Sequence, residues 1–360
     1  MNYKILATKY RPKSFKDVIG QKYIIKSIYN SFKFKKIHQS WILSGNSGIG
    51  KTTISRLLSK SLNCKKGIQY FSCLKCDNCI EITKGCFVDL IEIDAASKTK
   101  VEEIKEILEN SKYLPIKGRF KIYIIDEVHM LSKHSFNALL KILEEPPKYI
   151  KFILATTNIN KIPETIISRC ICFYLKQITE KQIYKHINKI LLQENIIAEK
   201  SAIKIISEKS NGNIRSALNI VEQSIMFDKN IIKKKNVINI LGIIEEKKIL
   251  LLSKYLINKK SNKTFDLLKK LNIIYFQWEE ILDSIIKLFH HFAILKKFGF
   301  SIERKTYMQK EKKKIIKIIK NVEFSKIQKY YNILIECKKE IYIYKNPQVC
   351  IEMMLLKILN

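Results

Sequence analysis

Arginine is scarce in this chain, although the net charge is strongly positive. Lys and Arg together number 67 of 360 residues against 33 acidic residues, a net charge of +34, yet only six of the 67 are Arg. Lys, Ile and Asn all have A/T-rich codons, so genome composition can account for much of the Lys excess. The charge is therefore only moderate evidence for nucleic-acid binding. An Arg that is retained despite this codon bias indicates a position where a planar guanidinium must bind phosphate through two hydrogen bonds, which Lys cannot do.

Long apolar runs are also absent. No stretch of eighteen apolar residues occurs, and the first nine residues lack the apolar core of a signal peptide. We therefore expect a cytoplasmic protein with no membrane partner. Thiols stay reduced in that compartment, so the nine Cys favour metal binding or core packing over disulfides.

Glycine and proline become rare in the second half of the chain. Only three of the 10 Gly and one of the 6 Pro lie between Ile178 and Asn360, where amphipathic helical patterns dominate. Before that point predicted strands alternate with predicted helices, which favours a parallel sheet covered on both faces. The predicted strands are 41–43, 90–94, 121–127, 152–157 and 170–173, and the predicted helices are 21–35, 102–113 and 135–145. We expect an α/β domain at 1–178, a small all-α domain at 179–242 and a larger helical bundle at 243–360.

One stretch fits the phosphate-cradling P-loop pattern G-x-x-x-x-G-K-[S/T]. Its residues are Gly45, Asn46, Ser47, Gly48, Ile49, Gly50, Lys51 and Thr52, with Thr53 next in the chain. A predicted strand precedes it and a helical pattern follows, which is the context that the motif requires. Backbone N–H groups and the helix N-terminus would bind phosphate. Lys51 would reach the β- and γ-phosphates of ATP, and Thr52 would bind Mg²⁺.

Two acids end the predicted strand 121–127. Asp126 would hold Mg²⁺ together with Thr52, and Glu127 would orient and deprotonate the attacking water. Thr156, Thr157 and Asn158 end the next strand, so one of them could sense the γ-phosphate. We favour Thr157, while a turn or helix cap is the rival interpretation.

Two of the rare arginines stand at positions that suit phosphate chemistry. Arg169 precedes the last predicted strand and could stabilise transition-state charge on the ATP of a neighbouring chain. Arg215 opens a predicted helix of the second domain and could fold back onto the phosphates. A surface ion pair is the alternative for Arg169, and a capping or salt-bridge role is the alternative for Arg215.

Four cysteines have the spacing of a metal site. Cys64, Cys73, Cys76 and Cys79 follow the pattern C-x₈-C-x₂-C-x₂-C. Four thiolates close the tetrahedral shell of Zn²⁺, so we interpret the segment 64–79 as a structural zinc insert. A redox pair or spare thiols remain the alternative.

Taken together, these motifs resemble the clamp-loader ATPases of the AAA+ superfamily, and within them the gamma/tau family of bacterial DNA polymerase III. The resemblance covers about residues 1–240. It rests on the P-loop, the four Cys and five further segments, namely residues 10–21, Ile125–Met130, Leu143–Pro147, Ser168–Cys170 and Gly212–Arg215. The zinc insert separates the chain from eukaryotic-type clamp loaders, and the intact P-loop separates it from the delta-prime subunit.

The resemblance implies a RecA-like AAA+ P-loop domain with a zinc-binding insert, followed by an all-α lid and an all-α oligomerisation collar. ATP, Mg²⁺ and Zn²⁺ are the implied cofactors. Lys51, Thr52, Asp126, Glu127, Arg169 and Arg215 would take the roles given above. Further residues would line the adenine pocket, and these are Ala7, Tyr10, Arg11, Pro12 and Val18.

The implied partners are delta, delta-prime and further gamma copies in a five-subunit ring, together with the sliding clamp and the phosphates of primer-template DNA. The implied activity is ATP hydrolysis that opens the clamp and loads it onto primed DNA during replication. As a holoenzyme subunit the chain would also fall in the class of DNA-directed DNA polymerases (nucleotidyltransferases). It ends at Asn360 without a tau-type extension, so we expect a gamma-length form.

Two other classes of function share part of this pattern. A P-loop translocase or helicase would use Lys51, Asp126 and Glu127 but would not require the zinc insert. A non-hydrolysing scaffold would leave the ATP site idle, which the presence of Lys51, Glu127 and Arg169 argues against.

Overall fold

The computed structural model describes residues 5–97, 109, 111, 113–227, 231–275, 278–299 and 312–359. The predicted helix at 102–113 lies almost wholly outside these residues. Packing divides the chain into two compact units, residues 1–237 and 238–360, each described by itself below.

The first unit is built on a five-stranded sheet with the strand order β2-β3-β4-β1-β5, in which every neighbouring pair is parallel. The strands are β1 (Ser40–Ser44), β2 (Leu90–Asp94), β3 (Lys121–Asp126), β4 (Ile150–Thr156) and β5 (Ile171–Tyr174). All five predicted strands are confirmed to within one or two residues at each end. Because the strands run in parallel, the carboxyl ends of β1, β3 and β4 meet at one edge.

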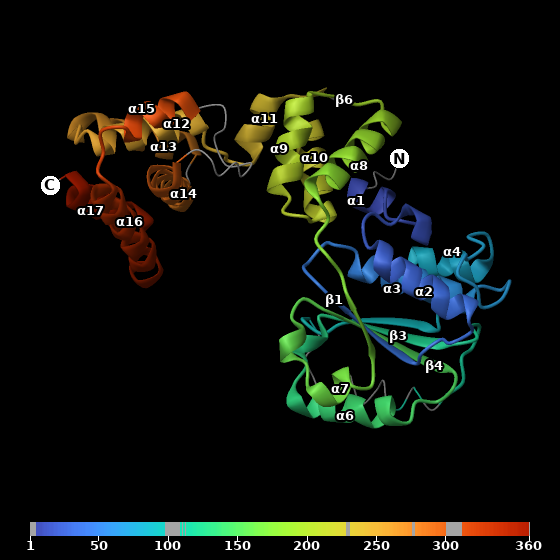
Figure 1. Cartoon of the computed structure of the whole chain (residues 1–360). Coiled ribbons are helices and arrows are strands. Elements are labelled where there is room, and N and C mark those ends of the chain that lie inside the picture. The colour runs from blue at the N-terminus through green and yellow to red at the C-terminus, as the bar shows by residue number, and fades with distance from the viewer. Residues whose placement is uncertain are drawn as a thin grey trace. The chain divides into compact units, whose positions relative to one another are not determined.

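Helices cover both faces of this sheet (Figure 1). Alternate residues of β3 face opposite sides, because successive side chains of a strand alternate. Ile122 and Ile124 are buried against α2 (Lys22–Lys33) and α3 (Lys51–Asn63). Tyr123 and Ile125 are buried against α6 (Lys133–Glu144). The smaller helical elements of this part are α1 (Leu6–Lys9), η1 (Phe15–Asp17), α4 (Asp77–Lys84), η2 (Val128–Met130), η3 (Ile159–Lys161) and α7 (Glu164–Ile167).

Helices dominate after residue 178, as expected. The first unit continues with α8 (Glu180–Gln193), α9 (Lys200–Lys209), α10 (Ile214–Phe227) and the start of α11 (Lys234–Ile240). The all-α expectation for this part was incomplete, because β6 (Ile197–Ala198) pairs in parallel with β7 (Ile231–Ile232). Two-residue strands are too short to leave a periodic pattern in a sequence.

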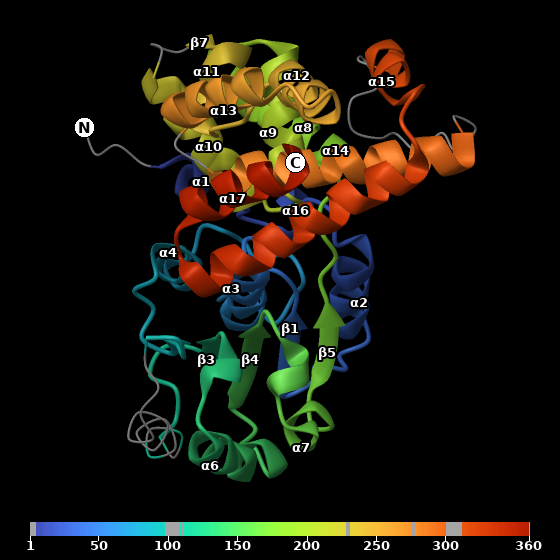
Figure 2. The same cartoon turned by 90° about the vertical axis from the view of Figure 1, so that its left-hand side faces the viewer.

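The second unit is helical throughout its described residues, and Figure 2 shows its long helices α14 and α16 side by side. Its elements are α12 (Glu246–Ile257), α13 (Ser261–Tyr275), α14 (Trp278–Phe298), α15 (Lys312–Ile319), α16 (Phe324–Tyr344) and α17 (Pro347–Leu359). Phe289 and Phe292 of α14 are fully buried in contact with each other, and Phe289 also packs against Tyr330 of α16. Within the Lys-rich segment, helix α15 has one apolar face, since its Ile315 and Ile319 are buried.

Candidate active site

The P-loop connects β1 to α3, as the motif predicts. Its three glycines all have positive φ, with values of 153° for Gly45, 70° for Gly48 and 109° for Gly50. A side chain at Gly48 would also collide with Asn213, the residue before α10, because a Cβ there would lie 2.0 Å from its Oδ1. Only glycine fits such a loop, in which the backbone must turn toward a bound anion.

The side chains of Lys51 and Thr52 meet the ends of neighbouring elements. Lys51 is 6% exposed, and its Nζ donates to the carbonyl oxygens of Gly45 at 2.8 Å and Asn46 at 3.3 Å. The Thr52 hydroxyl donates to Oδ2 of Asp126 at 2.8 Å. A hydroxyl and a carboxylate at this distance are hard oxygen ligands that suit Mg²⁺.

Glu127 is held in place by several contacts. Its backbone is in the left-handed region at a φ of 48°, an uncommon conformation for a residue other than glycine. Oε2 accepts hydrogen bonds from the backbone N–H of Thr157 at 3.0 Å and from its hydroxyl at 2.9 Å. Oε1 lies 3.6 Å from Nζ of Lys51. The second acid therefore lies directly beside Lys51 of the P-loop.

The three polar residues at the end of β4 have different surroundings. Thr156 is buried and its hydroxyl contacts His129 Nδ1 at 3.1 Å, while Asn158 caps η3. Thr157 alone among them hydrogen-bonds Glu127. Neither Thr156, Thr157 nor Asn158 lines the pocket described next.

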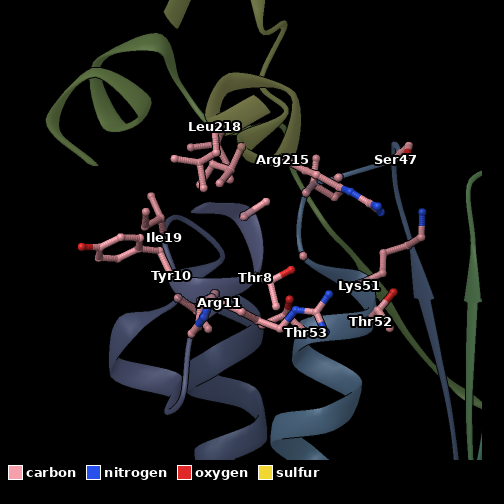
Figure 3. A pocket seen from close by; sticks show the side chains of 18 of the residues that line it. Thr8, Tyr10, Arg11, Ile19, Ser47, Lys51, Thr52, Thr53, Arg215 and Leu218 are labelled. Carbon is pink, nitrogen blue, oxygen red and sulfur yellow. The ribbon is translucent and has the colours of Figure 1, made fainter. Parts of the chain in front are cut away.

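A pocket of about 340 Å³ opens along the P-loop (Figure 3). The predicted residues Ser47 to Thr53, Asp126, Glu127 and Arg215 line it, and so do all five residues predicted for the adenine end, namely Ala7, Tyr10, Arg11, Pro12 and Val18. Residues that sequence reasoning missed include Thr8, Ile19, His186, Leu218 and Asn219. They stand within ordinary amphipathic or loop patterns, which carry no signal of a ligand.

Cationic side chains gather around this pocket. Burial lowers the pKa of Arg11, the positive charges of Arg56 and Arg215 lower it further, and the carboxylate of Glu92 opposes them. A polyanionic ligand would relieve this mutual repulsion. By contrast, burial and the nearby Lys189 lower the pKa of His186, which keeps that imidazole neutral at pH 7.

Arg169 lies outside the pocket of its own chain. Its guanidinium donates to the carbonyl oxygen of Thr165 at 2.6 Å and to Oε1 of Glu144 at 2.8 Å, and the ion pair is partly exposed. If Arg169 acts on ATP, it therefore acts on ATP bound by another chain.

Two further arginines have structural partners. Arg56 forms a two-pronged ion pair with Glu92 at 2.6 and 2.5 Å. Arg119 donates to the carbonyl oxygens of Cys64 at 2.5 Å and Lys65 at 3.0 Å, where the cysteine insert begins. The rare arginines therefore include residues with two hydrogen bonds inside the chain as well as candidate phosphate contacts.

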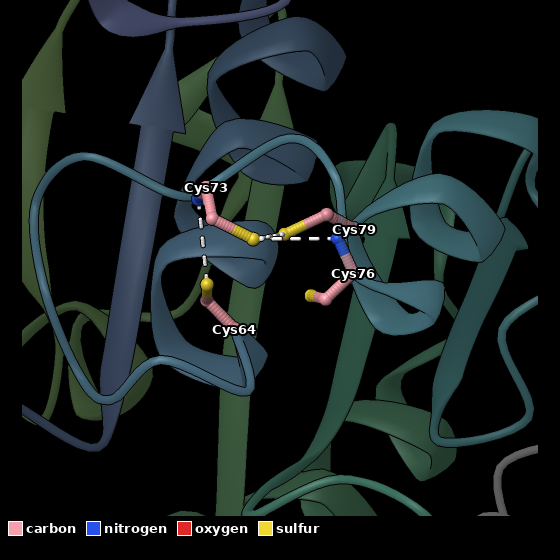
Figure 4. Close-up of side chains that lie close together, drawn as sticks. All are labelled: Cys64, Cys73, Cys76 and Cys79. Carbon is pink, nitrogen blue, oxygen red and sulfur yellow. Dashed lines mark hydrogen bonds between the residues drawn. The ribbon is translucent and has the colours of Figure 1, made fainter.

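The four predicted zinc ligands come together although the chain separates them by up to fifteen positions (Figure 4). The sulfur atoms of Cys64, Cys73, Cys76 and Cys79 all lie within 4.8 Å of one another, and those of Cys73 and Cys79 are 3.9 Å apart. Zn–S bonds of about 2.3 Å in a tetrahedron place sulfur atoms roughly 3.8 Å apart, so the cluster fits zinc. Backbone N–H groups of Lys75 and Cys76 lower the pKa of Cys73 to about 6, which favours the thiolate that a metal binds.

Comparison with known protein families matches three successive segments of the chain. Residues 20–179 match the model described as DNA polymerase III, delta subunit. Residues 182–230 match the DNA polymerase III clamp loader subunit, ATPase lid domain, and residues 232–360 match DNA polymerase III subunits gamma and tau domain III. Among the described residues, we find no helix with the length and apolar character that crossing a membrane requires.

Individual relatives cover the whole chain. The DNA polymerase III subunit gamma of Buchnera aphidicola subsp. Schizaphis graminum is 49% identical over 99% of this chain and 98% of its own length. The DNA polymerase III subunit tau of Escherichia coli is 39% identical over 100% of this chain, which spans 56% of that longer protein. A solved Thermotoga maritima RuvB Holliday junction branch migration motor aligns with 69% of this chain and 79% of its own, at 20% identity and a TM-score of 0.49, a likeness too weak to support an argument. Because the 49% identity with the first relative extends over nearly the full length of both chains, the chain belongs to the DNA polymerase III gamma/tau family.

Proposed function

We propose that this chain is an ATPase subunit of the clamp loader of bacterial DNA polymerase III, which uses ATP to open a sliding clamp and load it onto primed DNA. The observation that carries the proposal is the pocket in which Lys51, Thr52, Asp126 and Glu127 converge on one edge of the sheet. Family membership supplies the biological setting. The chain's own chemistry is then hydrolysis of a phosphoanhydride bond rather than nucleotidyl transfer.

The contacts support a distinct role for each residue of the phosphate end. Backbone N–H groups of the P-loop and Nζ of Lys51 would bind the phosphate oxygens. Thr52 and Asp126 would hold Mg²⁺, which supplies charge neutralisation between the phosphates when bound. Glu127 would take the proton of the attacking water, with Thr157 holding its carboxylate in position.

Glu127→Gln should separate binding from hydrolysis. The amide keeps the shape of the side chain but is not a base, so we expect the hydrolysis rate of the assembled complex to fall by about 10²- to 10⁴-fold. The Kd for ATP should stay within about threefold of the unaltered value. Steady-state ATPase rates and equilibrium ATP binding measure the two effects. Glu180→Gln, an exposed acid at the start of α8, is the matched control, and a Glu127→Gln complex that hydrolyses ATP at half the normal rate would exclude Glu127 as the base.

The proposed partners are other clamp-loader subunits and primed DNA. Because Arg169 lies outside its own pocket, the site would be completed by a neighbouring subunit in a ring that includes delta, delta-prime and further gamma copies. The three proposed domains, 1–178, 179–242 and 243–360, would serve as ATPase core, lid and oligomerisation collar. Primed DNA would be bound through its phosphates without reading of base sequence.

The cysteine cluster is proposed as a structural zinc site. Four thiols fill the tetrahedral shell, and Cys64 and Cys79 are buried, so no open position remains for a substrate. Zinc would hold the segment 64–79 folded against α3 and α4, while Arg119 binds the carbonyl oxygens at its start.

Metal analysis should therefore find about one zinc per chain. Cys76→Ser should lose most of this zinc, because it removes one of four ligands, whereas Cys86→Ser should retain it, since Cys86 lies outside the cluster. Elemental analysis of the purified variants, with a circular dichroism spectrum of each, makes the comparison. A folded, metal-free unaltered protein would refute the zinc assignment.

A DNA translocase is the second candidate function, favoured only by the shared P-loop and acids. It predicts that the chain alone unwinds DNA, which a strand-displacement assay tests.

A further inference from the structure

The residues at the end of the short helix α1 form the wall of the pocket opposite Lys51. Tyr10 and Arg11 line the pocket directly after this helix. Figure 3 shows the ring of Tyr10 on the side of the pocket away from Lys51, with its hydroxyl oxygen pointing away from the phosphate end. The hydroxyl is therefore free to bond a group outside the pocket.

That group is the carboxylate of Glu194, the residue that caps the C-terminus of α8. Oε1 of Glu194 accepts the Tyr10 hydroxyl, and Lys9 Nζ lies 2.6 Å from the same oxygen and donates to Oε2 at 2.8 Å. The bonds from Lys9 and Tyr10 lower the pKa of Glu194, while burial and Glu194 raise the pKa of Tyr10 to about 12. At neutral pH the carboxylate is thus charged and the phenol protonated, which are the states that this contact requires.

A second connection joins α1 to the same group of helices. The backbone N–H of Leu6 donates to Oε1 of Glu222 at 3.3 Å, and Glu222 is 6% exposed on α10. Arg215, which reaches the pocket, stands at the start of α10. Both connections from α1 therefore run to helices that follow residue 178, although α1 precedes the sheet in sequence.

We propose that Glu194 is a positioning residue for nucleotide binding, which holds Tyr10 at the base end of the pocket and makes α1 move together with α8 and α10. The proposal rests on the proposed function of the pocket as an ATP site. Tyr10 at the base end of the pocket and Arg215 at the phosphate end would then move together with α8 and α10. A nucleotide that contacts both residues would bring these helices closer to the P-loop. Without Glu194, binding would have to order Tyr10 itself, at the expense of affinity.

The test compares two ligands, ATP and inorganic tripolyphosphate, which lacks the base and ribose. Glu194→Ala should raise the Kd for ATP by about 10-fold, because it removes hydrogen bonds to a charged group. The Kd for tripolyphosphate should change by less than about twofold. A general structural defect at the P-loop would weaken both ligands alike. Isothermal calorimetry or competition with a fluorescent nucleotide measures both constants.

Further variants test whether the Tyr10–Glu194 contact itself causes the effect. Tyr10→Phe removes only the hydroxyl, and the double variant Tyr10→Phe/Glu194→Ala should bind ATP no more weakly than Glu194→Ala, since both changes break one contact. If Glu194→Ala does not fold, Tyr10→Phe alone breaks the same contact and should weaken ATP binding while leaving the Kd for tripolyphosphate unaltered. Glu208→Gln, an exposed acid paired with Lys204 on α9, is the matched control and should leave the Kd for ATP unaltered.

The outcomes separate this proposal from the proposed function. Normal ATP binding by Glu194→Ala, equal weakening of ATP and tripolyphosphate, or additive effects in the double variant would each overturn the role of Glu194 alone. An unaltered chain that binds no ATP would overturn the ATP site itself, and the role of Glu194 with it.

Discussion

Arg169→Ala should lower ATP hydrolysis by the assembled clamp loader by about 10³-fold or more while leaving ATP binding intact. An arginine supplied by a neighbouring subunit stabilises negative charge on the transferred phosphoryl group, and such arginines contribute about 10³- to 10⁵-fold to the rate. Arg169 lines no part of its own chain's pocket, so the Kd of the isolated chain for ATP should stay unaltered. ATPase rates of the complex and ATP binding by the chain check the two halves of this prediction.

If Arg169 serves only in a surface ion pair, Arg169→Ala should cause a much smaller loss of hydrolysis rate. Its ion pair with Glu144 is partly exposed, and pairs of this kind contribute about 0–1 kcal/mol to folding. A 10³-fold loss of rate corresponds to about 4 kcal/mol in the transition state, which a surface ion pair cannot supply. Glu144→Gln is the matched control, because it breaks the same pair and leaves the arginine in place. If Glu144→Gln and Arg169→Ala slowed hydrolysis equally, the ion pair would explain the effect.

Lys51→Ala should weaken ATP binding by about 100-fold or more and thereby abolish clamp loading. The ammonium group bonds carbonyl oxygens of the loop, so it already points along the surface where phosphates would lie. Hydrogen bonds between charged partners contribute about 1.5–3 kcal/mol each, and two phosphates would be lost as partners. Equilibrium binding of ATP measures the change.

The control for Lys51 must preserve the size of the side chain. Lys51→Met keeps the length of the chain without the charge and should bind ATP as weakly as Lys51→Ala. Lys84→Ala removes an exposed lysine at the end of α4 and should leave binding unaltered. Strong ATP binding by Lys51→Met would show that charge at this position is dispensable and would contradict the phosphate-binding role.

The sequence predicted those parts of the site that depend on local spacing. Glycines at fixed offsets between a strand and a helix identify a P-loop whatever surrounds them. Asp126 and Glu127 follow an apolar run that had to be a buried strand, so their place at the edge of the sheet followed from strand parallelism. The cysteines were recognised in the same way, because x₂ spacings let thiolates converge without help from the rest of the fold.

Contacts between distant segments could not be predicted in this way. Tyr10 and Glu194 are 184 positions apart, and Gly48 meets Asn213 only because α10 returns to the loop. The left-handed backbone of Glu127 could not be predicted either. Such a conformation usually occurs at glycine, and a glutamate in the sequence gives no sign of it. The two contacts between distant segments arise from packing of the segments after residue 178 against the residues that line the pocket, which no local pattern encodes.

The central claim is that this ATP site hydrolyses ATP as part of an assembled complex whose activity is stimulated by primed DNA. The most direct test is the rate of ATP hydrolysis by the reconstituted complex, with and without sliding clamp and primed DNA, over a range of salt concentrations. We expect a low rate for the isolated chain. For the complex we expect a large increase with clamp and primed DNA that falls steeply with salt and does not depend on DNA sequence. Full hydrolysis by the isolated chain, or a complex indifferent to primed DNA, would contradict the account.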